Sequence, residues 1–286
     1  MSPRASRRKA LTVPGAPVAS VESATPVESA GPVEPAQSAG PAMAPGAVRP
    51  TVRFRISRSR KGDRKRHFDA FEVAPEWGAT VLDALLQIRR RHDPSLVVRH
   101  SCMHASCGTC GVRVNGREVL ACDTPIAGLP ARKPIKVEPL ANQRLVADVA
   151  TDMVDFYARF EAADMPLVRA AEVGSGVVPP DGIRAFGRFE NCIECGLCLS
   201  ACPIARTNHE YIGPAALAAA ARAVAEPRGR ELGPVLALAA EPDSVWRCRD
   251  AMECTAVCPS AVDPATAILT LRRHIAANRV RRLLRR

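Results

Sequence analysis

SCMHASCGTCGVRVNGREVLAC, residues 101–122, combines a cysteine-rich loop with a turn between two short alternating runs. Asn115 and Gly116 favour a two-residue type I′ turn, in which both central residues adopt positive φ. Such a turn pairs residue 114 with 117 and, counting back, residue 110 with 121. The hairpin therefore returns Cys122 beside Cys110, and a slip of one residue would turn Cys122 to the opposite face.

The cysteines of this stretch have the spacing C-x4-C-x2-C with a distant fourth, which is typical of plant-type 2Fe-2S clusters: Cys102, Cys107, Cys110 and Cys122. Small residues between them allow a loop to wrap tightly around a cluster. A structural zinc site normally uses two separated C-x2-C pairs and fits this spacing poorly. A Rieske centre would need two histidines in place of two cysteines. We therefore expect the neighbouring His100 and His104 to face solvent or to contact the ligands.

Two further cysteine runs follow. NCIECGLCLSACP, residues 191–203, is a complete C-x2-C-x2-C-x3-C-P run and indicates a 4Fe-4S cluster. WRCRDAMECTAVCP, residues 246–259, lacks the second cysteine of that run, because Ala251 stands in its place. In two-cluster ferredoxins the fourth cysteine of each run ligates the other cluster. Applied here, this exchange gives one cluster four thiolates (Cys192, Cys195, Cys198, Cys258) and the other three (Cys202, Cys248, Cys254).

The incomplete set predicts a 3Fe-4S cluster, because a cubane with an apolar methyl group at its open corner should lose one iron. A 4Fe-4S cluster with water or another residue as fourth ligand is the alternative. The assignment uses all eleven cysteines, as sets of four, four and three. Arg247 and Arg249 flank Cys248. They are either plain solvated charges or groups that favour the reduced, more negative cluster.

The chain divides into three segments by composition and periodicity. Residues 1–50 are rich in Pro and Ala and contain no aromatic residue, so we expect a disordered tail. A transit peptide is an alternative that the acidic residues Glu22, Glu28 and Glu34 weaken. Residues 51–145 form the predicted first domain, and residues 146–286 the predicted second.

In the first domain, TVRFRISRSR alternates as a half-buried strand with Val52, Phe54 and Ile56 on one face. HFDAFEVA is expected to pair with it as a hairpin. A helix should begin after the cap residue Thr80 and end before Asp93-Pro94. The second domain is predicted to be helical, beginning near LVADVATDMVDFYARFEAA, residues 145–163, and continuing to the C-terminus.

Composition limits the class of protein. The formal net charge of +11 indicates an anionic partner, unless negatively charged clusters offset it. Eleven cysteines without a secretory signal favour metal ligation in a reducing compartment over disulfides. No window has the roughly 18 uncharged apolar residues of a membrane helix. We therefore do not expect the chain to span a membrane by itself.

Three clusters without a nicotinamide or flavin fingerprint suggest an electron relay whose organic chemistry lies in a partner. The order 2Fe-2S, 4Fe-4S, 3Fe-4S resembles the iron–sulfur subunit of succinate dehydrogenase and fumarate reductase. The resemblance extends from about Val52 to Ile275. Besides the cysteine-containing stretches it includes TVLDALLQI, residues 80–88, and YIGPAALAAAARAV, residues 211–224.

The resemblance implies an α+β chain, with an N-terminal β-grasp ferredoxin domain followed by an all-α bacterial-ferredoxin-like domain that holds two clusters. It implies a flavoprotein subunit with covalent FAD, a membrane anchor and a quinone as partners. Electrons would pass from succinate to quinone, or in reverse to fumarate. The chain would lie peripherally at the cytoplasmic face of the plasma membrane, or at the mitochondrial inner membrane in a eukaryote.

The chain departs from the family pattern near the expected quinone site. Members often have tryptophan shortly after the position of Cys202-Pro203, histidine directly after the position of Cys248, and lysine after the last cysteine-proline. Here the chain has IARTN, Arg249 and Ser260 instead. The resemblance suggests Pro203, Trp246 and Arg249 as quinone contacts, although Trp246 could equally be core packing. The C-terminal RRHIAANRVRRLLRR fits a basic helix on an anionic membrane, or a plain solvated helix end.

Two other classes of protein remain as alternatives. One is the iron–sulfur subunit of a different flavin-linked oxidoreductase, glycolate oxidase-like or heterodisulfide reductase-like. Such subunits usually have two complete four-cysteine runs, which Ala251 contradicts. The other is a basic, zinc-dependent nucleic-acid binder, but the chain lacks zinc-ligand pairing and aromatic residues for stacking on bases. We therefore expect no nucleic-acid partner.

Overall fold

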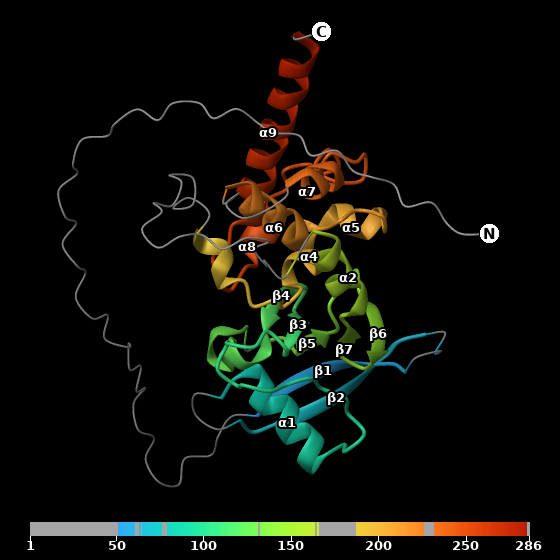
Figure 1. The fold of residues 1–286 in the computed structure, drawn as a ribbon. Helices are drawn as coiled ribbons and strands as arrows, with labels where there is room; N and C mark the ends of the chain where they lie inside the picture. Colours follow the sequence, from blue (N-terminus) through green and yellow to red (C-terminus); the bar gives the residue numbers. More distant parts are fainter. Residues whose placement is uncertain are drawn as a thin grey trace, which may run out of the picture. The chain divides into compact units, whose positions relative to one another are not determined.

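A computed structural model of the chain describes residues 51–60, 63, 65–75, 79–130, 132–163, 165, 187–225 and 232–284. The tail expected at residues 1–50 lies outside them. The strands are β1 (Val52–Arg58), β2 (His67–Val73), β3 (Gly111–Val114), β4 (Arg117–Leu120), β5 (Ile135–Glu138), β6 (Arg144–Ala147) and β7 (Ala150–Asp152). The α-helices are α1 (Val81–Arg91), α2 (Val154–Ala162), α4 (Leu197–Ala201), α5 (Pro203–Thr207), α6 (Pro214–Ala225), α7 (Leu232–Ala239), α8 (Glu253–Ala256) and α9 (Pro264–Leu284) (Figure 1). This mixture confirms the α+β class.

Five strands form a mixed sheet in the order β2-β1-β5-β3-β4. β1 and β2 are the antiparallel hairpin expected from their alternating sequences, with Val52 opposite Val73. β1 also pairs in parallel with β5. Phe54 and Ile56 are fully buried, as the alternation predicts. Helix α1 packs its apolar side, from Val81 to Ile88, into the same core.

Helix α1 begins and ends where the sequence indicates. The Thr80 hydroxyl accepts a hydrogen bond from the backbone N–H of Asp83, and the Asp83 carboxylate accepts one from the backbone N–H of Thr80. This capping box satisfies two amides that would otherwise lack partners at the helix start. Three arginines occupy the last turn, where positive charge is favourable.

The β3–β4 hairpin has the predicted register. Val114 lies opposite Arg117, and the turn residues Asn115 and Gly116 have φ of 51° and 89°. The backbone N–H of Ala121 donates to the carbonyl of Cys110 at 3.1 Å. The strand pair therefore brings Cys122 back beside Cys110, where the two Sγ atoms are 3.2 Å apart.

The helical prediction for residues 145–152 is wrong. This segment forms the β6–β7 hairpin, and helix starts only at Val154. Asp148, at the turn, has a φ of 49° that does not fit a helix. Its buried carboxylate accepts hydrogen bonds from Arg58 Nε and from the backbone N–H groups of Ser59 and Val97. These partners lie far away in sequence, so they override the local helical preference.

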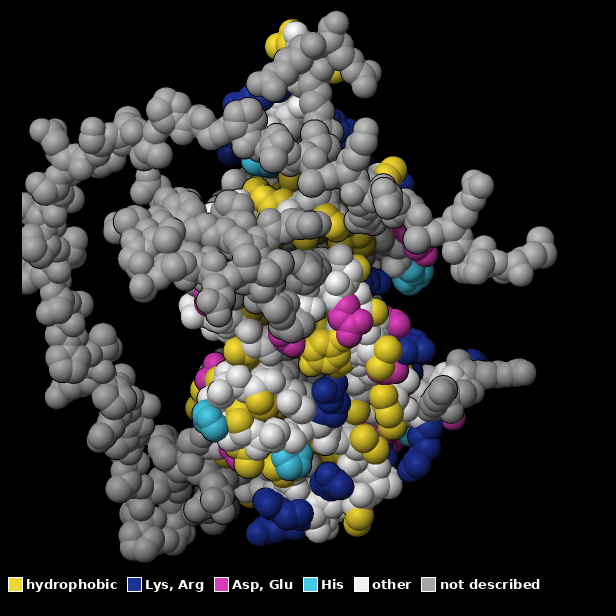
Figure 2. All heavy atoms as spheres, in the orientation of Figure 1, with side chains coloured by type: hydrophobic (Ala, Val, Ile, Leu, Met, Phe, Trp, Pro, Cys, Tyr) yellow, Lys and Arg dark blue, Asp and Glu magenta, His cyan; other side chains and the backbone are white. Residues whose placement is uncertain are grey.

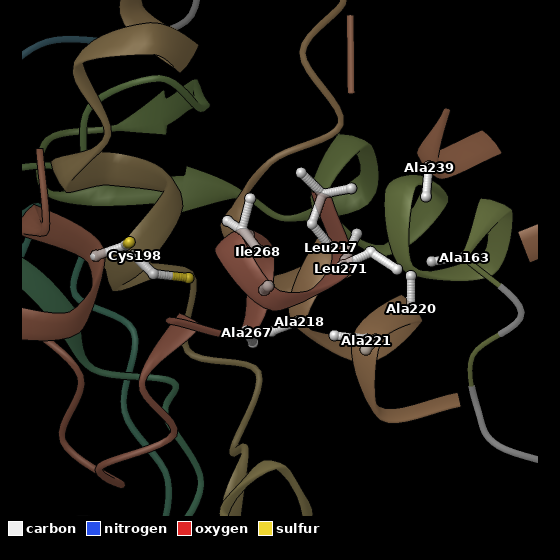
Figure 3. Packing of buried hydrophobic residues seen from close by; sticks show 14 of the residues in the cluster. Ala163, Cys198, Leu217, Ala218, Ala220, Ala221, Ala239, Ala267, Ile268 and Leu271 are labelled. Atoms are coloured by element: carbon white, nitrogen blue, oxygen red, sulfur yellow. The ribbon is translucent and has the colours of Figure 1, made fainter. Parts of the chain in front are cut away.

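Buried side chains form two hydrophobic clusters. One includes residues from Phe54 to Val149, together with Leu197 of α4, and the other runs from Met153 to Ile275. The domain boundary near residue 145 stays a prediction. In the second cluster the alanines of α6 pack against Ile268 and Leu271 of α9, and Cys198 lies in the same core (Figure 3). Alanine side chains let the helices approach closely, so this half has a tightly packed core.

Within the described residues, no helix combines the length and the apolar character needed to cross a lipid bilayer.

Candidate iron–sulfur sites

The loop from Cys102 to Cys110 turns its backbone amides toward sulfur atoms. Met103, Ala105 and Gly108 have positive φ of 62°, 61° and 68°. The N–H of Ala105 donates to Cys122 Sγ at 3.2 Å, and Cys102 Sγ accepts from the N–H groups of Ser106 and Cys107, each at 3.3 Å. Backbone segments of this kind form concave sites for anions. The loop therefore fits an anionic iron–sulfur cluster.

The four thiols of this site differ in burial: Cys102 and Cys107 are half-buried, whereas Cys110 and Cys122 are buried. Hydrogen bonds from backbone amides, that of His104 first, lower the pKa of Cys102 to about 7. Burial raises the pKa of Cys110 to about 12, so its thiol must give up a proton when it ligates iron. His100 and His104 are exposed, as expected. In the structure the four predicted ligands share one loop and one hairpin.

The second group of cysteines brings both runs together. Cys192, Cys195 and Cys198, from the first run, line one cavity with Cys258, the last cysteine of the second run. Burial raises the pKa of Cys195 to about 12, with smaller contributions from Cys192 and Cys258. The backbone N–H of Val262 donates to Cys258 Sγ at 3.4 Å. The four cysteines that the exchange assigns to one cluster therefore surround one space.

The third group consists of Cys202, Cys248 and Cys254. Burial, with smaller contributions from the neighbouring Cys202 and Cys248, raises the pKa of Cys254 to about 12. Cys202 and Cys254 belong to the same hydrophobic core, against which Cys248 packs. Ala251 is exposed on the loop between Cys248 and Cys254. The structure thus places together the three cysteines predicted for the incomplete cluster.

The first two groups meet where their loops touch. A Cβ atom added to Gly108 would lie 2.8 Å from both the Cys195 side chain and the Ile193 carbonyl oxygen. Glycine at this position therefore allows a backbone contact between the 102–110 loop and the 192–198 loop. A small cavity beside the contact is lined from both loops, by Cys107 and Thr109 on one side and Glu194 and Cys195 on the other.

Polar residues that cysteine spacing could not identify hold helix α4 against the sheet. Ser200 Oγ, fully buried, donates to the buried carboxylate of Glu118 on β4 at 2.9 Å. Asn142 Nδ2 donates to the carbonyls of Leu199, Ser200 and Cys202. These bonds satisfy carbonyls at the end of α4 and so fix the backbone beside Cys198 and Cys202.

The charged groups near Cys248 differ in their surroundings. Arg247 pairs with Asp243 at 2.8 Å, and Arg249 is exposed. Arg272 of α9, which sequence reasoning missed, donates to the carbonyls of Val245 at 3.0 Å and of Cys248 at 2.8 Å. No local signal marks this residue, because it lies 24 positions from Cys248. Arg272 is therefore the arginine whose bonds hold the Cys248 backbone.

The residues suggested as quinone contacts flank the third group. Pro203 and Arg249 are exposed, and each directly follows a cysteine of that group, Cys202 or Cys248. Trp246 is half-buried. Its indole N–H donates to the Ala240 carbonyl at 3.1 Å, and the Arg279 guanidinium lies 4.9 Å from its ring centre. The indole N–H is therefore already engaged and Arg279 covers part of the ring, so only the remaining ring surface could contact a ligand.

Comparisons with known proteins match two cluster-binding domains to the chain. Residues 53–158 match the family described as a 2Fe-2S iron-sulfur cluster binding domain, and residues 188–262 match a 4Fe-4S dicluster domain. A chain of the Mycobacterium smegmatis Sdh1 complex in the apo form has a similar fold, with a TM-score of 0.70 at 23% identity. The match covers 81% of this chain and 98% of that chain.

Curated relatives match over most of the chain. The fumarate reductase iron-sulfur subunit of Mycobacterium tuberculosis is 36% identical over 76% of this chain and 89% of its own. That of Escherichia coli O157:H7 is 36% identical over 72% and 85%. The succinate dehydrogenase iron-sulfur subunit of Coxiella burnetii is 34% identical over 73% and 90%. With relatives 34–36% identical over 72–76% of the chain, the chain belongs to the family of fumarate reductase and succinate dehydrogenase iron–sulfur subunits.

Proposed function

We propose that the chain relays electrons between a FAD-bearing catalytic subunit and a membrane quinone, through a 2Fe-2S, a 4Fe-4S and a 3Fe-4S cluster. Each cluster, when bound, takes up and releases electrons at a potential set by its type and surroundings. The chain supplies the thiolates: Cys102, Cys107, Cys110 and Cys122 for the first cluster, Cys192, Cys195, Cys198 and Cys258 for the second, and Cys202, Cys248 and Cys254 for the third.

One observation carries this proposal: the cysteines of the two runs are interleaved in space. Cys258 shares a cavity with three cysteines of the first run, and Cys202 neighbours Cys254 of the second. The contact between Gly108 and Cys195 adds a short route from the first group to the second. Electron transfer slows steeply with distance, so this close sequence of sites favours a relay.

The surroundings of the third site support a position beside a membrane anchor and a quinone. Pro203, Trp246 and Arg249 flank this site and are the quinone contacts that we propose. Helix α9 exposes Val280, Leu283 and Leu284. Lys and Arg side chains accompany hydrophobic ones at the end of the chain that carries α9 (Figure 2). We place the chain peripherally, at the cytoplasmic face of a plasma membrane. The sheet with α1 across it is consistent with a β-grasp domain.

The test is EPR spectroscopy of the purified complex, oxidised and then reduced with dithionite, together with counts of iron and acid-labile sulfide. Three distinct centres are expected, including a signal from an oxidised 3Fe-4S cluster. Two 4Fe-4S centres would instead favour another class of flavin-linked oxidoreductase. A colourless protein that contains zinc would overturn the proposal altogether.

Replacing Gly108 with alanine should slow electron transfer from the 2Fe-2S to the 4Fe-4S cluster. The new Cβ would collide with Cys195 and the Ile193 carbonyl, each at 2.8 Å, so the loops must move apart. Rapid-freeze EPR after substrate addition would measure the rate at which the second cluster is reduced. Gly128→Ala is the control, because nothing lies within 4 Å of a Cβ atom added at that position. Equal rates in both variants would contradict a role for the contact.

Replacing Arg272 with glutamine should lower the reduction potential of the third cluster. The variant loses a positive charge and the hydrogen bonds to the carbonyls of Val245 and Cys248, and positive charge favours the more negative, reduced state. We expect a shift of up to about 59 mV, a tenfold change for one electron, in an EPR-monitored redox titration. Arg273→Gln removes the same charge from the next, exposed position and should have a smaller effect.

A further inference from the structure

The hydroxyl of Tyr211 is buried without a partner. Tyr211 is 0% exposed, and its Oη atom forms no hydrogen bond with any part of the chain that the structure describes. An unsatisfied buried hydroxyl costs about 1–3 kcal/mol, so buried phenols usually have an acceptor. An orphan of this kind indicates that an acceptor outside the described part of the chain completes the site.

The surroundings of the side chain identify the place of that acceptor. Burial raises the pKa of Tyr211, and the next contributions come, in decreasing order, from the nearby thiols of Cys248, Cys202, Cys254 and Cys198. The first three are the cysteines of the third group, and Cys198, of the second group, contributes least. Tyr211 also shares a core with Cys202 and Cys254. The phenol therefore lies at the site of the incomplete cluster.

The backbone of Tyr211 is held from both sides. Its N–H donates to the Asn208 carbonyl at 3.4 Å, and its carbonyl accepts from Arg159 Nη1 at 2.9 Å. The next residue, Ile212, donates its N–H to the Asp243 carbonyl at 3.2 Å. With its backbone held and its side chain fully buried, Tyr211 has little freedom to turn its hydroxyl toward another acceptor.

We propose that the Tyr211 hydroxyl donates a hydrogen bond to a sulfur atom of the 3Fe-4S cluster and thereby raises its reduction potential. This inference rests on the proposed function, because it requires that cluster. Cluster sulfurs carry negative charge and accept hydrogen bonds, and such bonds shift cluster potentials. The bond strengthens when an added electron makes the sulfurs more negative. Tyr211 therefore stabilises the reduced state of the last cluster in the relay.

The test compares two variants in the assembled complex. The chain has two tyrosines, so Tyr157→Phe makes the same chemical change at an exposed residue. In Tyr211→Phe we expect the 3Fe-4S EPR signal to remain and its equilibrium constant for reduction to fall about tenfold, a decrease of about 59 mV. The potential in Tyr157→Phe should match that of the wild type. An unchanged potential in Tyr211→Phe overturns the inference.

A second measurement uses the wild-type side chain, in case the variant fails to assemble. Tyrosine labelled with ¹⁷O at the phenol should give a hyperfine coupling to the oxidised 3Fe-4S centre by ENDOR spectroscopy. The coupling should persist in labelled Tyr157→Phe, which leaves Tyr211 as its source. Absence of any coupling overturns the inference while the 3Fe-4S signal is present. Absence of that signal from the wild type refutes the proposed function instead.

Discussion

The Cys258→Ala variant is expected to lose the 4Fe-4S cluster and keep the 3Fe-4S cluster, although Cys258 belongs to the incomplete run. Its thiol lines a cavity with Cys192, Cys195 and Cys198, all from the other run. Removing it leaves that cluster with three protein ligands and a methyl group at the fourth corner, so, as at Ala251, the cubane should lose one iron and cease to be 4Fe-4S. EPR of the reduced complex should therefore lose the 4Fe-4S signal, while the oxidised 3Fe-4S signal persists.

The wild-type stoichiometry cannot test this exchange. If each run served its own cluster, the first run would still supply four cysteines and the second three. Both arrangements predict the same iron count and the same cluster types. Only the variants separate them, because a local arrangement would make Cys258→Ala lose the 3Fe-4S cluster.

Cys202→Ala provides the mirror experiment. Cys202 stands in the complete run, but its thiol neighbours Cys254 of the other run. The exchange predicts that this variant loses the 3Fe-4S signal and retains the 4Fe-4S cluster. A 4Fe-4S loss in Cys202→Ala, together with a 3Fe-4S loss in Cys258→Ala, would refute the exchange.

The sequence predicts correctly those elements whose hydrogen-bonding partners lie close together along the chain. The capping box fixes the start of α1 through Thr80 and Asp83, which lie three residues apart. The Asn115-Gly116 turn sets the register of β3 and β4 and brings Cys122 beside Cys110. In both cases the bonding partners lie within one turn or one hairpin, so a short window contains the information.

The sequence was a poor guide where distant residues decide the structure. Residues 145–152 were expected to be helical, yet Asp148 binds Arg58, 90 positions away, and the segment becomes a hairpin. Near the third group of cysteines, the sequence points to Arg247 and Arg249, which flank Cys248. In the structure it is Arg272 of α9 that donates a hydrogen bond to the Cys248 carbonyl. Asn142 gives no local signal for the same reason, because its partners lie on α4, and Tyr211 gives none because the cysteines around it come from other elements of the fold.

Replacing Ala251 with cysteine should convert the third cluster from 3Fe-4S to 4Fe-4S. The substitution restores the spacing of a complete C-x2-C-x2-C-x3-C-P run. Asp250 and Met252, on either side, have φ of 58° and 59°, so the loop keeps its shape through residues other than Ala251. The oxidised 3Fe-4S signal should disappear, iron should rise by about one atom per chain, and the new cluster should have a lower potential.

A lower potential at the last cluster should slow quinone-linked turnover in Ala251→Cys, because that cluster would receive electrons less readily. Ala251→Val is the matched control, since its side chain cannot ligate iron and position 251 is exposed enough to accept it. This control should keep the 3Fe-4S signal and nearly normal turnover. If Ala251→Cys instead keeps its oxidised 3Fe-4S signal and its iron content, position 251 does not face the open corner of the cluster. The absence of a cysteine at position 251 would then not be the reason that the third cluster holds three irons.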